Sequence, residues 1–310
     1  MGKLIDGNWV VKSVATNNKS GEYERIPRSF RNTISSSDDQ FKPESGRYHL
    51  YVSYACPWAH RTLIYRSLKD LEEHISVSVV SPDMLDDGWV FDDKFPGATV
   101  DHINGFKFLR DVYLKADAHI STSVTVPILW DKKLNTIVNN ESSEIIRILN
   151  SGFNELTGNT TNFYPKEKQT EIDELNDFIY PNINNGVYRT GFASSQEAYS
   201  TAVTSLFDSL DRIESILEGK QYLVADALTE ADIRLITTLL RFDIVYYGHF
   251  KCNIRQIKDY KNLSSYVRRL YEIPGIKKTT NLEHIKRHYY YSHDGINPFR
   301  IVPLGPDVIF

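Results

Sequence analysis

The 310-residue sequence predicts an α/β domain of thioredoxin-like architecture followed by an all-helical domain. Three observations support this prediction. Residues 47–82 follow the pattern strand, helix, strand; two short strands and a helix come before residue 150; and beyond residue 165 the apolar residues recur at helical spacing. The resulting order, βαβ, an insertion, then ββα, is typical of a thioredoxin-like domain.

A strand, a helix and a second strand form the first part of the α/β domain. Apolar residues alternate with neighbours of mixed polarity over Tyr48–Val52, recur at helical spacing over residues 63–71, and become β-branched over residues 75–80. The loop before the helix contains Cys56 and Pro57. Because proline has no N–H and a preset φ, Pro57 suits the first helical position. Cys56 is therefore expected at a helix N-terminus.

The setting of Cys56 predicts an activated thiol. The positive end of the helix dipole and the first-turn N–H groups favour the thiolate, so the pKa of this thiol should lie below the free-cysteine value of about 8.5. Ala59 stands where a dithiol CxxC motif has its second cysteine. A mixed disulfide on Cys56 therefore needs a thiol from outside, and glutathione is the natural candidate. A buried structural cysteine, or half of a zinc site with His60, remain alternatives.

Composition and charge narrow the class of protein. With 41% hydrophobic and 25% charged residues, the chain can bury a substantial core. A net charge of −4 gives no indication of a nucleic-acid or anionic-membrane partner. Two cysteines provide no disulfide framework, which suits a reducing compartment. The N-terminus has no apolar signal region and no apolar run is long enough to span a membrane, so we expect a cytoplasmic protein without a resident metal.

The rest of the α/β domain, residues 47–150, follows an N-terminal extension over residues 1–46. The extension is polar and irregular, with scattered aromatic residues that predict an arm packed over the body. A weakly periodic insertion occupies about residues 83–122, with a possible helix over 112–116, and an insertion of this length is usually functional or a lid.

Beyond the insertion, residues 124–131 form a strand interrupted by Pro127, which belongs at an edge, at a bulge or in a turn with a cis bond. A strand over 136–138 and a helix over 145–149 follow, with Asn140 or Ser142 as the expected N-cap.

The second domain is predicted to be entirely helical over residues 163–293, with an irregular tail over 294–310. An amphipathic helix over 168–180 should end at Pro181. Thr229 is the expected N-cap of the most apolar helix, which we place at the centre of the domain. The further helices are expected over residues 196–217, 264–271 and 282–288.

A series of short motifs resembles the glutathione transferase superfamily and, within it, the glutathionyl-hydroquinone reductases, the omega-like Xi class. The resemblance covers essentially the whole chain and implies the glutathione transferase fold. Its motifs are Tyr54-Ala55-Cys56-Pro57-Trp58-Ala59-His60-Arg61, Asp87-Gly88-Trp89, Thr125-Val126-Pro127-Ile128-Leu129-Trp130-Asp131, Val138-Asn139-Asn140-Glu141-Ser142-Ser143-Glu144, Asn184-Asn185-Gly186-Val187-Tyr188, Gly191-Phe192-Ala193, His288-Tyr289-Tyr290 and Ser292-His293.

The resemblance implies a cysteine-dependent reductase of glutathionylated hydroquinones. The Cys56 thiolate would attack the glutathionyl sulfur of the substrate, expel the hydroquinone and become joined to glutathione, and a second glutathione would release the oxidised disulfide. The family holds glutathione by the residue before a cis-proline, by a Glu-Ser pair and by a tryptophan. In the present sequence the cis-proline and the residue before it correspond to Pro127 and Val126. The Glu-Ser pair corresponds to Glu141 and Ser142, and the tryptophan to Trp89.

The same resemblance assigns the hydroquinone pocket to Tyr188, Tyr289 and Tyr290, since phenols stack on an aromatic ring and hydrogen-bond its hydroxyls. It also implies a homodimer. Each assignment has a purely structural alternative: Trp89 as an anchor of the insertion, Glu141 as a capping acid, and the tyrosines as packing residues.

The sequence departs from the family just before the Val-Pro segment. Where the family usually has Gly-Arg, this chain has Thr122 and Ser123, so an anion contact to glutathione is missing unless Arg110 or Lys107 supplies it. Two other functions therefore remain open. One is an omega-like thiol transferase or dehydroascorbate reductase, and the other is a non-catalytic binding protein on the same fold.

Overall fold

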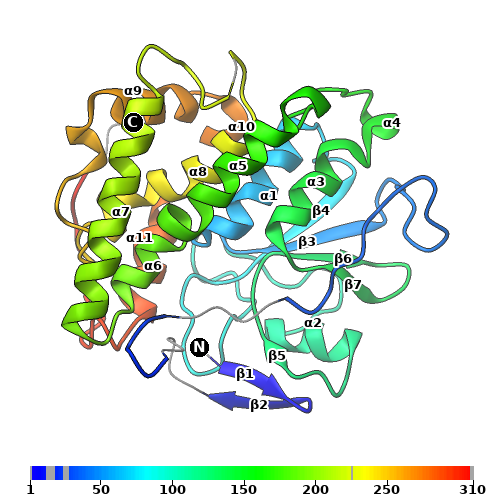
Figure 1. Ribbon diagram of the computed structural model, residues 1–310. Coiled ribbons are helices and arrows are strands. Elements are labelled where there is room, and N and C mark those ends of the chain that lie inside the picture. The colour runs from blue at the N-terminus through cyan, green and yellow to red at the C-terminus, as the bar shows by residue number, and fades with distance from the viewer. Residues whose placement is uncertain (1, 12–17, 24–27, 225, 308–310) are drawn as a thin grey trace. The chain divides into compact units, whose positions relative to one another are not determined.

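The computed structural model describes residues 2–11, 18–23, 28–224 and 226–307 (Figure 1). The chain divides into two compact units. Unit 1 comprises Met1–Val14, Ile26–Thr161 and Thr279–Ser292, and unit 2 comprises Ala15–Arg25, Asn162–Lys278 and His293–Phe310.

The centre of unit 1 is a four-stranded sheet in the order β4-β3-β6-β7. Its strands are β3 (Tyr48–Val52), β4 (Ile75–Val79), β6 (Ile128–Asp131) and β7 (Thr136–Asn139). β3 is parallel to β4 and antiparallel to β6. Because a parallel pair needs a long crossover, α1 (Pro57–Leu68) connects β3 to β4. β3, β4, β7 and α1 lie where the sequence predicts them, whereas β6 is shorter than the predicted strand over 124–131 and begins only after Pro127.

Helices cover both faces of this sheet (Figure 1). On one face, α1 packs against α3 (Ser142–Ser151). On the other face lies α2 (Leu109–Ala116), which confirms the helix expected near the end of the insertion. Every residue of β3 is buried, as expected for a strand covered on both sides. The arrangement is that of a thioredoxin-like domain.

The first residues correct the sequence interpretation, which treated the N-terminal extension as irregular. Strands β1 (Gly2–Ile5) and β2 (Asn8–Val11) form a hairpin, and β1 also pairs with β5 (Thr122–Ser123). The turn residues Asp6 and Gly7 both have positive φ, at 46° and 72°. Asp-Gly is strongly favoured in such a two-residue hairpin turn, so the local sequence did contain the signal.

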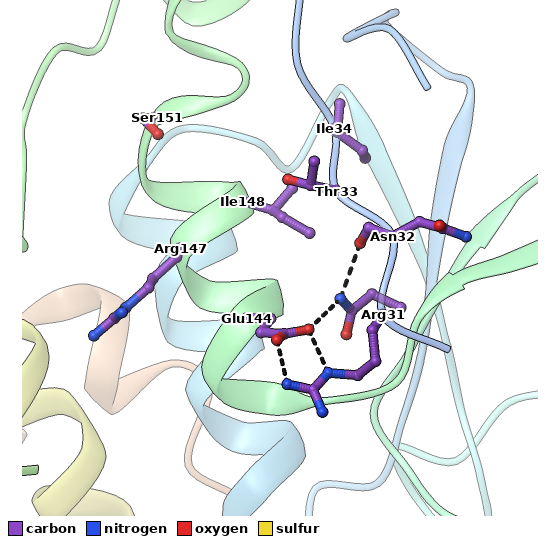
Figure 2. A pocket seen from close by; sticks show the side chains of 9 residues that line it. Arg31, Asn32, Thr33, Ile34, Glu144, Arg147, Ile148 and Ser151 are labelled. Carbon is purple, nitrogen blue, oxygen red and sulfur yellow. Dashed lines mark hydrogen bonds and ion pairs between the residues drawn. The ribbon is translucent and has the colours of Figure 1, made fainter. Parts of the chain in front are cut away.

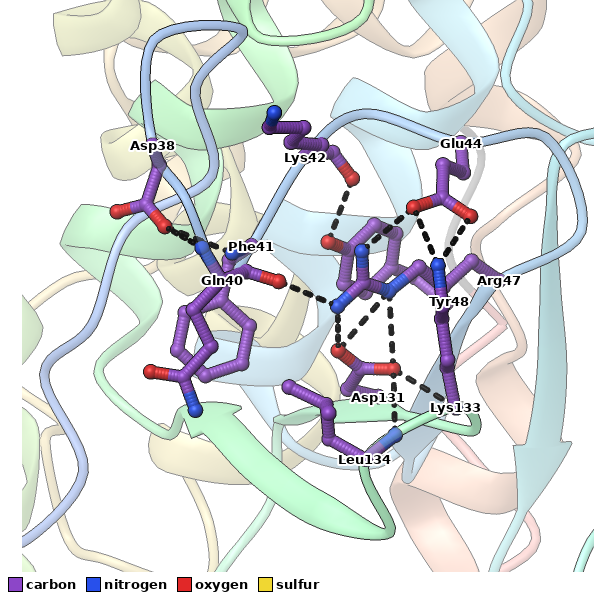
Figure 3. Close-up of polar contacts among 10 residues, drawn as sticks. All are labelled: Asp38, Gln40, Phe41, Lys42, Glu44, Arg47, Tyr48, Asp131, Lys133 and Leu134. Atoms are coloured by element: carbon purple, nitrogen blue, oxygen red, sulfur yellow. Dashed lines mark hydrogen bonds and ion pairs between the residues drawn. The ribbon is translucent and has the colours of Figure 1, made fainter.

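A buried ion pair fastens the last residues of the extension to the sheet (Figure 3). The Nε of Arg47 lies 3.1 and 3.0 Å from the two carboxylate oxygens of Asp131, which is fully buried at the end of β6. The other guanidinium nitrogens donate to Glu44 and to the carbonyl of Gln40, both at 2.7 Å. These hydrogen bonds offset the desolvation of both charges and hold residues 40–44 of the extension at the start of β3.

The start of α3 differs from the predicted one. Neither Asn140 nor Ser142 is the N-cap: Glu141 is, and its carboxylate accepts the backbone N–H of Ser143 at 3.0 Å. Because this side chain satisfies a first-turn donor, the helix begins at Ser142 rather than at residue 145.

Among the described residues of unit 2, the regular elements are all helices. Its elements are η1 (Lys166–Lys168), α5 (Gln169–Ile179), η2 (Tyr180–Asn184), α6 (Gly186–Gly191), α7 (Gln196–Ile216), α8 (Glu230–Arg241), η3 (Phe242–Tyr246), η4 (Ile257–Asp259), α9 (Lys261–Tyr271) and α10 (Pro274–Lys277). The short α4 (Asn154–Thr157) belongs to unit 1. All residues of α8 are buried, which confirms it as the central helix, and Thr229 with Asp232 forms its capping box.

Helix α5 confirms the helix predicted over 168–180, since it ends at Ile179, just before Pro181. The chain then continues through the π-helical turn η2, in which Asn185 N donates to Tyr180 O at 2.8 Å and the missing proline N–H is tolerated near the start of the turn. Helix α11 (Leu282–Ser292), predicted within the all-helical domain over 163–293, groups with unit 1. Its side chains are bonded to the insertion, as described below.

Candidate active site

Cys56 is the N-cap of α1, as the sequence predicted. Its φ and ψ are −78° and 120°, and Pro57 occupies the first helical position. The Cys56 carbonyl accepts His60 N at 2.9 Å, which begins the helical hydrogen-bond ladder. The side chain is half-buried. The thiol is therefore reachable and lies at the positive end of a helix dipole, where a thiolate is stabilised.

The residue before the internal proline lies next to this thiol. Cys56 Sγ is 3.7 Å from the carbonyl oxygen of Val126, and the Val126–Pro127 bond is cis. The tyrosine hydroxyl of α2 supports the same segment, since Tyr113 donates to the carbonyl of Thr125 at 2.9 Å. The structure thus brings Cys56, Val126 and Pro127 together at one point of unit 1.

The start of α3 is linked to α1 by an arginine. Arg61 Nη1 lies 3.5 Å from Ser142 Oγ, and its guanidinium lies 4.6 Å from the centre of the Trp58 ring. Arg61 is buried. Its positive charge adds to the dipoles of two helix N-termini, so this part of unit 1 is suited to an anionic ligand. One carboxylate oxygen of Glu141 caps α3 by accepting Ser143 N. The capping role that the sequence analysis gave as the structural alternative for Glu141 is therefore present.

Trp89 is nearly fully buried, with 5% of its surface exposed, and its ring stacks on His288 at 4.7 Å between centroids and 20° between planes. The Trp89 carbonyl accepts Leu109 N at 3.0 Å. A backbone hydrogen bond within the insertion therefore holds the main chain that carries the Trp89 side chain.

The two candidates for the missing family arginine have other contacts. Arg110 donates to Asp87 O at 2.7 Å and lies 3.8 Å from the centre of the Phe108 ring, so it braces the turn before Trp89. Lys107 is exposed, with Nζ 5.1 Å from the Phe108 ring centre. Thr122 and Ser123, where the family has Gly-Arg, form strand β5 against β1.

The three tyrosines predicted to line a hydroquinone pocket fall in different units. Tyr289 is buried and Tyr290 is half-buried in α11, within unit 1. Tyr188 belongs to unit 2, where it lies in an aromatic cluster with ring-centroid distances of 6.5 Å to Tyr23 and 5.5 Å to Phe250. Tyr188 is buried, with 8% of its surface exposed in the folded chain.

A cavity of about 330 Å³ lies elsewhere in unit 1, between the extension and the outer face of α3 (Figure 2). Arg31 and Glu144 form an ion pair on its wall, which lowers the pKa of the Glu144 carboxyl. Asn139 donates to the same carboxylate at 2.8 Å. None of the predicted site residues lines this cavity; its lining is Arg31, Asn32, Thr33, Ile34, Asn139, Glu144, Arg147, Ile148 and Ser151.

The zinc alternative finds no support in the described part of the chain. His60 is buried and its Nε2 lies 3.1 Å from Thr279 Oγ1. Among the residues that the structure describes, no group of three or more His, Cys, Asp or Glu side chains could hold a metal ion. None of the described helices is long and apolar enough to cross a membrane.

His288 is the residue to which sequence reasoning assigned no role. It was noticed only as part of the His288-Tyr289-Tyr290 motif, and nothing in its local spacing indicates a partner more than a hundred residues away. Only the fold places its ring on Trp89.

Comparison with known proteins agrees with this geometry. The profile of the glutathione S-transferase N-terminal domain matches residues 55–151, and that of the C-terminal domain matches residues 196–269. Together they define a glutathione transferase, with a thioredoxin-like and a helical domain.

Individual relatives narrow this class. Glutathionyl-hydroquinone reductase YqjG of Escherichia coli is 53% identical over 99% of this chain and 95% of its own length. Glutathionyl-hydroquinone reductase PcpF of Sphingobium chlorophenolicum is 51% identical over 99% and 96%. The chain belongs to this family, the Xi-class glutathione transferases.

Solved structures show the same relationship. The glutathione transferase Xi of Phanerochaete chrysosporium aligns with a TM-score of 0.92 at 54% identity, covering 94% of this chain and 95% of that one. The glutathione-bound structure of YqjG aligns with a TM-score of 0.90 at 51% identity, covering 99% and 96%. The resemblance inferred from the motifs, and the fold that it implied, are thereby confirmed.

Proposed function

We propose that this protein is a glutathione-dependent reductase of glutathionyl-hydroquinones, with Cys56 as the nucleophile. The observation that carries the proposal is the half-buried Cys56 thiol at the N-cap of α1, 3.7 Å from Val126 O and beside a cis-proline. The names of the relatives YqjG and PcpF supply the substrate class. Ala59 leaves no resolving cysteine one turn along α1, which requires a second thiol.

In the first step, the Cys56 thiolate attacks the glutathionyl sulfur of the substrate. A sulfur–sulfur bond forms between Cys56 and glutathione, and the bond from that sulfur to the aromatic carbon breaks. The released electron pair stays on the ring carbon, which takes up a proton, so the ring is reduced to the free hydroquinone. The dipole of α1 supports this step by favouring the attacking thiolate.

In the second step, the thiolate of another glutathione molecule attacks the glutathionyl sulfur of the mixed disulfide. Glutathione disulfide leaves and Cys56 returns to the thiolate. In sum, one glutathionyl-hydroquinone and one glutathione give one hydroquinone and one glutathione disulfide. The two electrons gained by the ring come from the two sulfurs that become the disulfide.

Residues of unit 1 would bind the cosubstrate. Val126 offers its main chain to an extended tripeptide, and Glu141 and Ser142 meet the γ-glutamyl end at the N-terminus of α3, where a carboxylate is favoured. Trp89 lies beside glutathione in this proposal. Arg61, buried beside Ser142, supplies part of the positive potential that the absent family arginine would provide.

The family resemblance assigns hydroquinone binding to the phenols of Tyr188, Tyr289 and Tyr290, since a phenol can stack on an aromatic ring and hydrogen-bond its hydroxyls. Because turnover consumes reduced glutathione, we also place the protein in the reducing cytoplasm. As a member of this family we expect it to be a homodimer, and light scattering coupled to gel filtration would measure the mass.

Incubation of the purified protein with glutathionyl-menadiol and glutathione tests the reaction. We expect release of menadiol and, when glutathione is limiting, a protein mass increased by one glutathione on Cys56. Glutathione binding without hydroquinone release would overturn the proposed reaction and favour the omega-like thiol transferase or the non-catalytic protein. Reduction of a small mixed disulfide and of dehydroascorbate in the same preparation would separate those two.

A substitution tests the tyrosine assignment. Tyr188→Phe removes one hydroxyl and keeps the aromatic packing, so we expect hydroquinone release to slow by about tenfold while reduction of a small mixed disulfide changes by less than about twofold. Equal losses on both substrates would show that Tyr188 does not contact the hydroquinone.

A further inference from the structure

One face of α11 is bonded to the insertion that contains Trp89. Arg287 Nε and Nη2 lie 2.6 and 2.8 Å from the carboxylate of Asp83, and His284 Nε2 lies 2.9 Å from the carbonyl of Pro96. Two turns beyond His284 along α11, Ser292 Oγ accepts a hydrogen bond from Met84 N at 3.0 Å. Residues three and four apart share a helix face, so these contacts form a single seam within unit 1.

His288 lies in the middle of this seam. Its Nδ1 is 2.9 Å from the carbonyl oxygen of Pro82, and Ser292 Oγ donates to the same oxygen at 3.1 Å. A carbonyl oxygen only accepts, so Nδ1 of His288 carries the hydrogen. This hydrogen bond sets the rotation of the imidazole about its side-chain bonds and therefore the plane of the ring.

The Trp89 indole stacks on the face of the His288 imidazole, whose plane this hydrogen bond sets. The two rings are separated by 4.7 Å between centroids with 20° between their planes, and both side chains are at least nine-tenths buried. Stacked aromatic rings in this range attract each other beyond the effect of area burial. The backbone of Trp89 is held separately, by Leu109 N and by the pairing of Val90 with Phe108. The remaining freedom of the indole is rotation of its side chain, and stacking on the His288 ring restricts this rotation.

We propose that His288 is a positioning residue that orients the Trp89 indole for glutathione. This inference rests on the proposed function, because it takes Trp89 to lie beside the cosubstrate. It predicts that His288 determines the affinity for glutathione and has little influence on the chemical step at Cys56. The hydrogen bond to Pro82 orients the imidazole, and the imidazole face then orients Trp89.

Two substitutions separate the ring from its hydrogen bond. In His288→Asn the amide nitrogen replaces Nδ1 and retains the donor to Pro82, but the stacking surface is lost. In His288→Phe the flat ring is retained and the donor is lost. We expect the Asn variant to raise the Kd of glutathione, measured by titration calorimetry, by about fivefold, and the Phe variant by less than about twofold.

Kinetics give a readout that a general loss of structure would not produce. For His288→Asn, the KM for glutathione should rise by about fivefold while kcat at saturating glutathione stays within about twofold of the parent value. A loss confined to kcat would overturn the proposal, because it would place His288 in the chemistry. If the Asn variant fails to fold, as judged by circular dichroism, the comparison is made between His288→Phe and the parent, where a rise beyond about fivefold overturns the role of the ring.

A double-mutant cycle tests whether His288 acts through Trp89. Trp89→Leu removes the indole, so adding His288→Asn to that variant should change the Kd of glutathione by less than about 1.5-fold. Independent, multiplicative effects of the two substitutions would overturn the inference.

The binding assay keeps the two proposals distinguishable. If glutathione binds and the cycle shows coupling, the positioning role stands even where no hydroquinone is released. If Trp89→Leu leaves the Kd unchanged, the positioning role is overturned while reductase activity, measured separately, is unaffected by that result.

Discussion

The two cysteines of the chain have opposite surroundings. Cys56, in unit 1, is half-buried at the N-cap of α1. Cys252, in unit 2, is fully buried, and its Sγ lies 3.9 and 4.0 Å from the backbone carbonyls of Val187 and Phe250. Burial raises the pKa of the Cys252 thiol far above its ordinary value. A thiolate is stabilised at a helix N-terminus and is penalised among carbonyl oxygens in a dry interior.

The comparison shows that cysteine content by itself does not identify a nucleophile. Both side chains have the same chemistry in water, and the local dipoles and the access to solvent make one a candidate nucleophile and the other a small packing residue. Substitution, labelling and pH each test a different part of this contrast.

The largest expected difference is in catalysis. Cys56→Ala should lower hydroquinone release by at least about 10³-fold, because no other described group of unit 1 replaces the nucleophile. Cys252→Ala is the matched control, and its rate should stay within about twofold of the parent rate. The rate of menadiol release from glutathionyl-menadiol measures both. Similar losses in the two variants would remove the contrast.

The next difference is in chemical reactivity of the folded protein. Iodoacetamide near neutral pH should alkylate Cys56 at least about 10²-fold faster than Cys252, since Cys252 reacts only when its surroundings open. Peptide mass spectrometry at successive times gives both rates, and a sample in urea provides the control in which both sites react. Comparable rates in the folded protein would contradict the assignment of Cys252 as a closed packing residue.

A smaller difference is expected in the pH dependence of stability. The folded protein keeps the Cys252 thiol protonated because its pKa is raised, whereas the unfolded chain releases that proton above about pH 8.5. Alkaline pH therefore favours the unfolded chain. Relative to Cys252→Ala, the free energy of unfolding of the parent should decrease by about 2 kcal/mol between neutral pH and about pH 10.

Urea denaturation of both proteins across this range measures the difference. The tyrosines and lysines titrate in both proteins and cancel in the comparison. Parallel pH profiles would show that Cys252 is not as strongly desolvated as its buried position implies.

The smallest effect concerns the backbone beside Cys252. Lys251 has a φ of 58°, in the left-handed region that favours glycine. Lys251→Gly should relieve this strain and raise the free energy of unfolding by about 0.5 kcal/mol, after the greater flexibility of glycine in the unfolded chain is subtracted. Urea denaturation is the measurement, with catalytic rate as the control that should not change. A lower free energy of unfolding would mean that contacts of the Lys251 side chain stabilise the folded protein by more than its left-handed backbone conformation destabilises it.

Much of the fold was predictable because its signals are local. Strands β3 and β4, helix α1 and the buried helix α8 follow directly from apolar periodicity, Pro57 and the Thr229 capping box. The hairpin of β1 and β2 was missed although Asp6-Gly7 is a hairpin signal, because the flanking strands are short and weakly alternating. The start of α3 was misplaced because a glutamate is a less common cap than Ser142 or Asn140.

The candidate site was predictable only in part. Cys56 and the Val126–Pro127 segment lie where the sequence and the resemblance placed them, and the Sγ–carbonyl distance of 3.7 Å brings them together. The stacking of His288 on Trp89, and the bonds from α11 to the insertion, join segments about two hundred residues apart. Such pairs have no periodicity or spacing in the sequence to indicate them.

The sequence by itself determined the order of elements, the helix N-terminus at Cys56, the absence of a second cysteine in that motif and the family to which the chain belongs. These depend on backbone preferences and on short motifs, which act within a few residues. The tertiary structure alone decided that α11 groups with the thioredoxin-like unit and that the His288 ring stacks on Trp89. Burial and stacking depend on groups that the folded chain brings together from distant segments, so no local pattern specifies them.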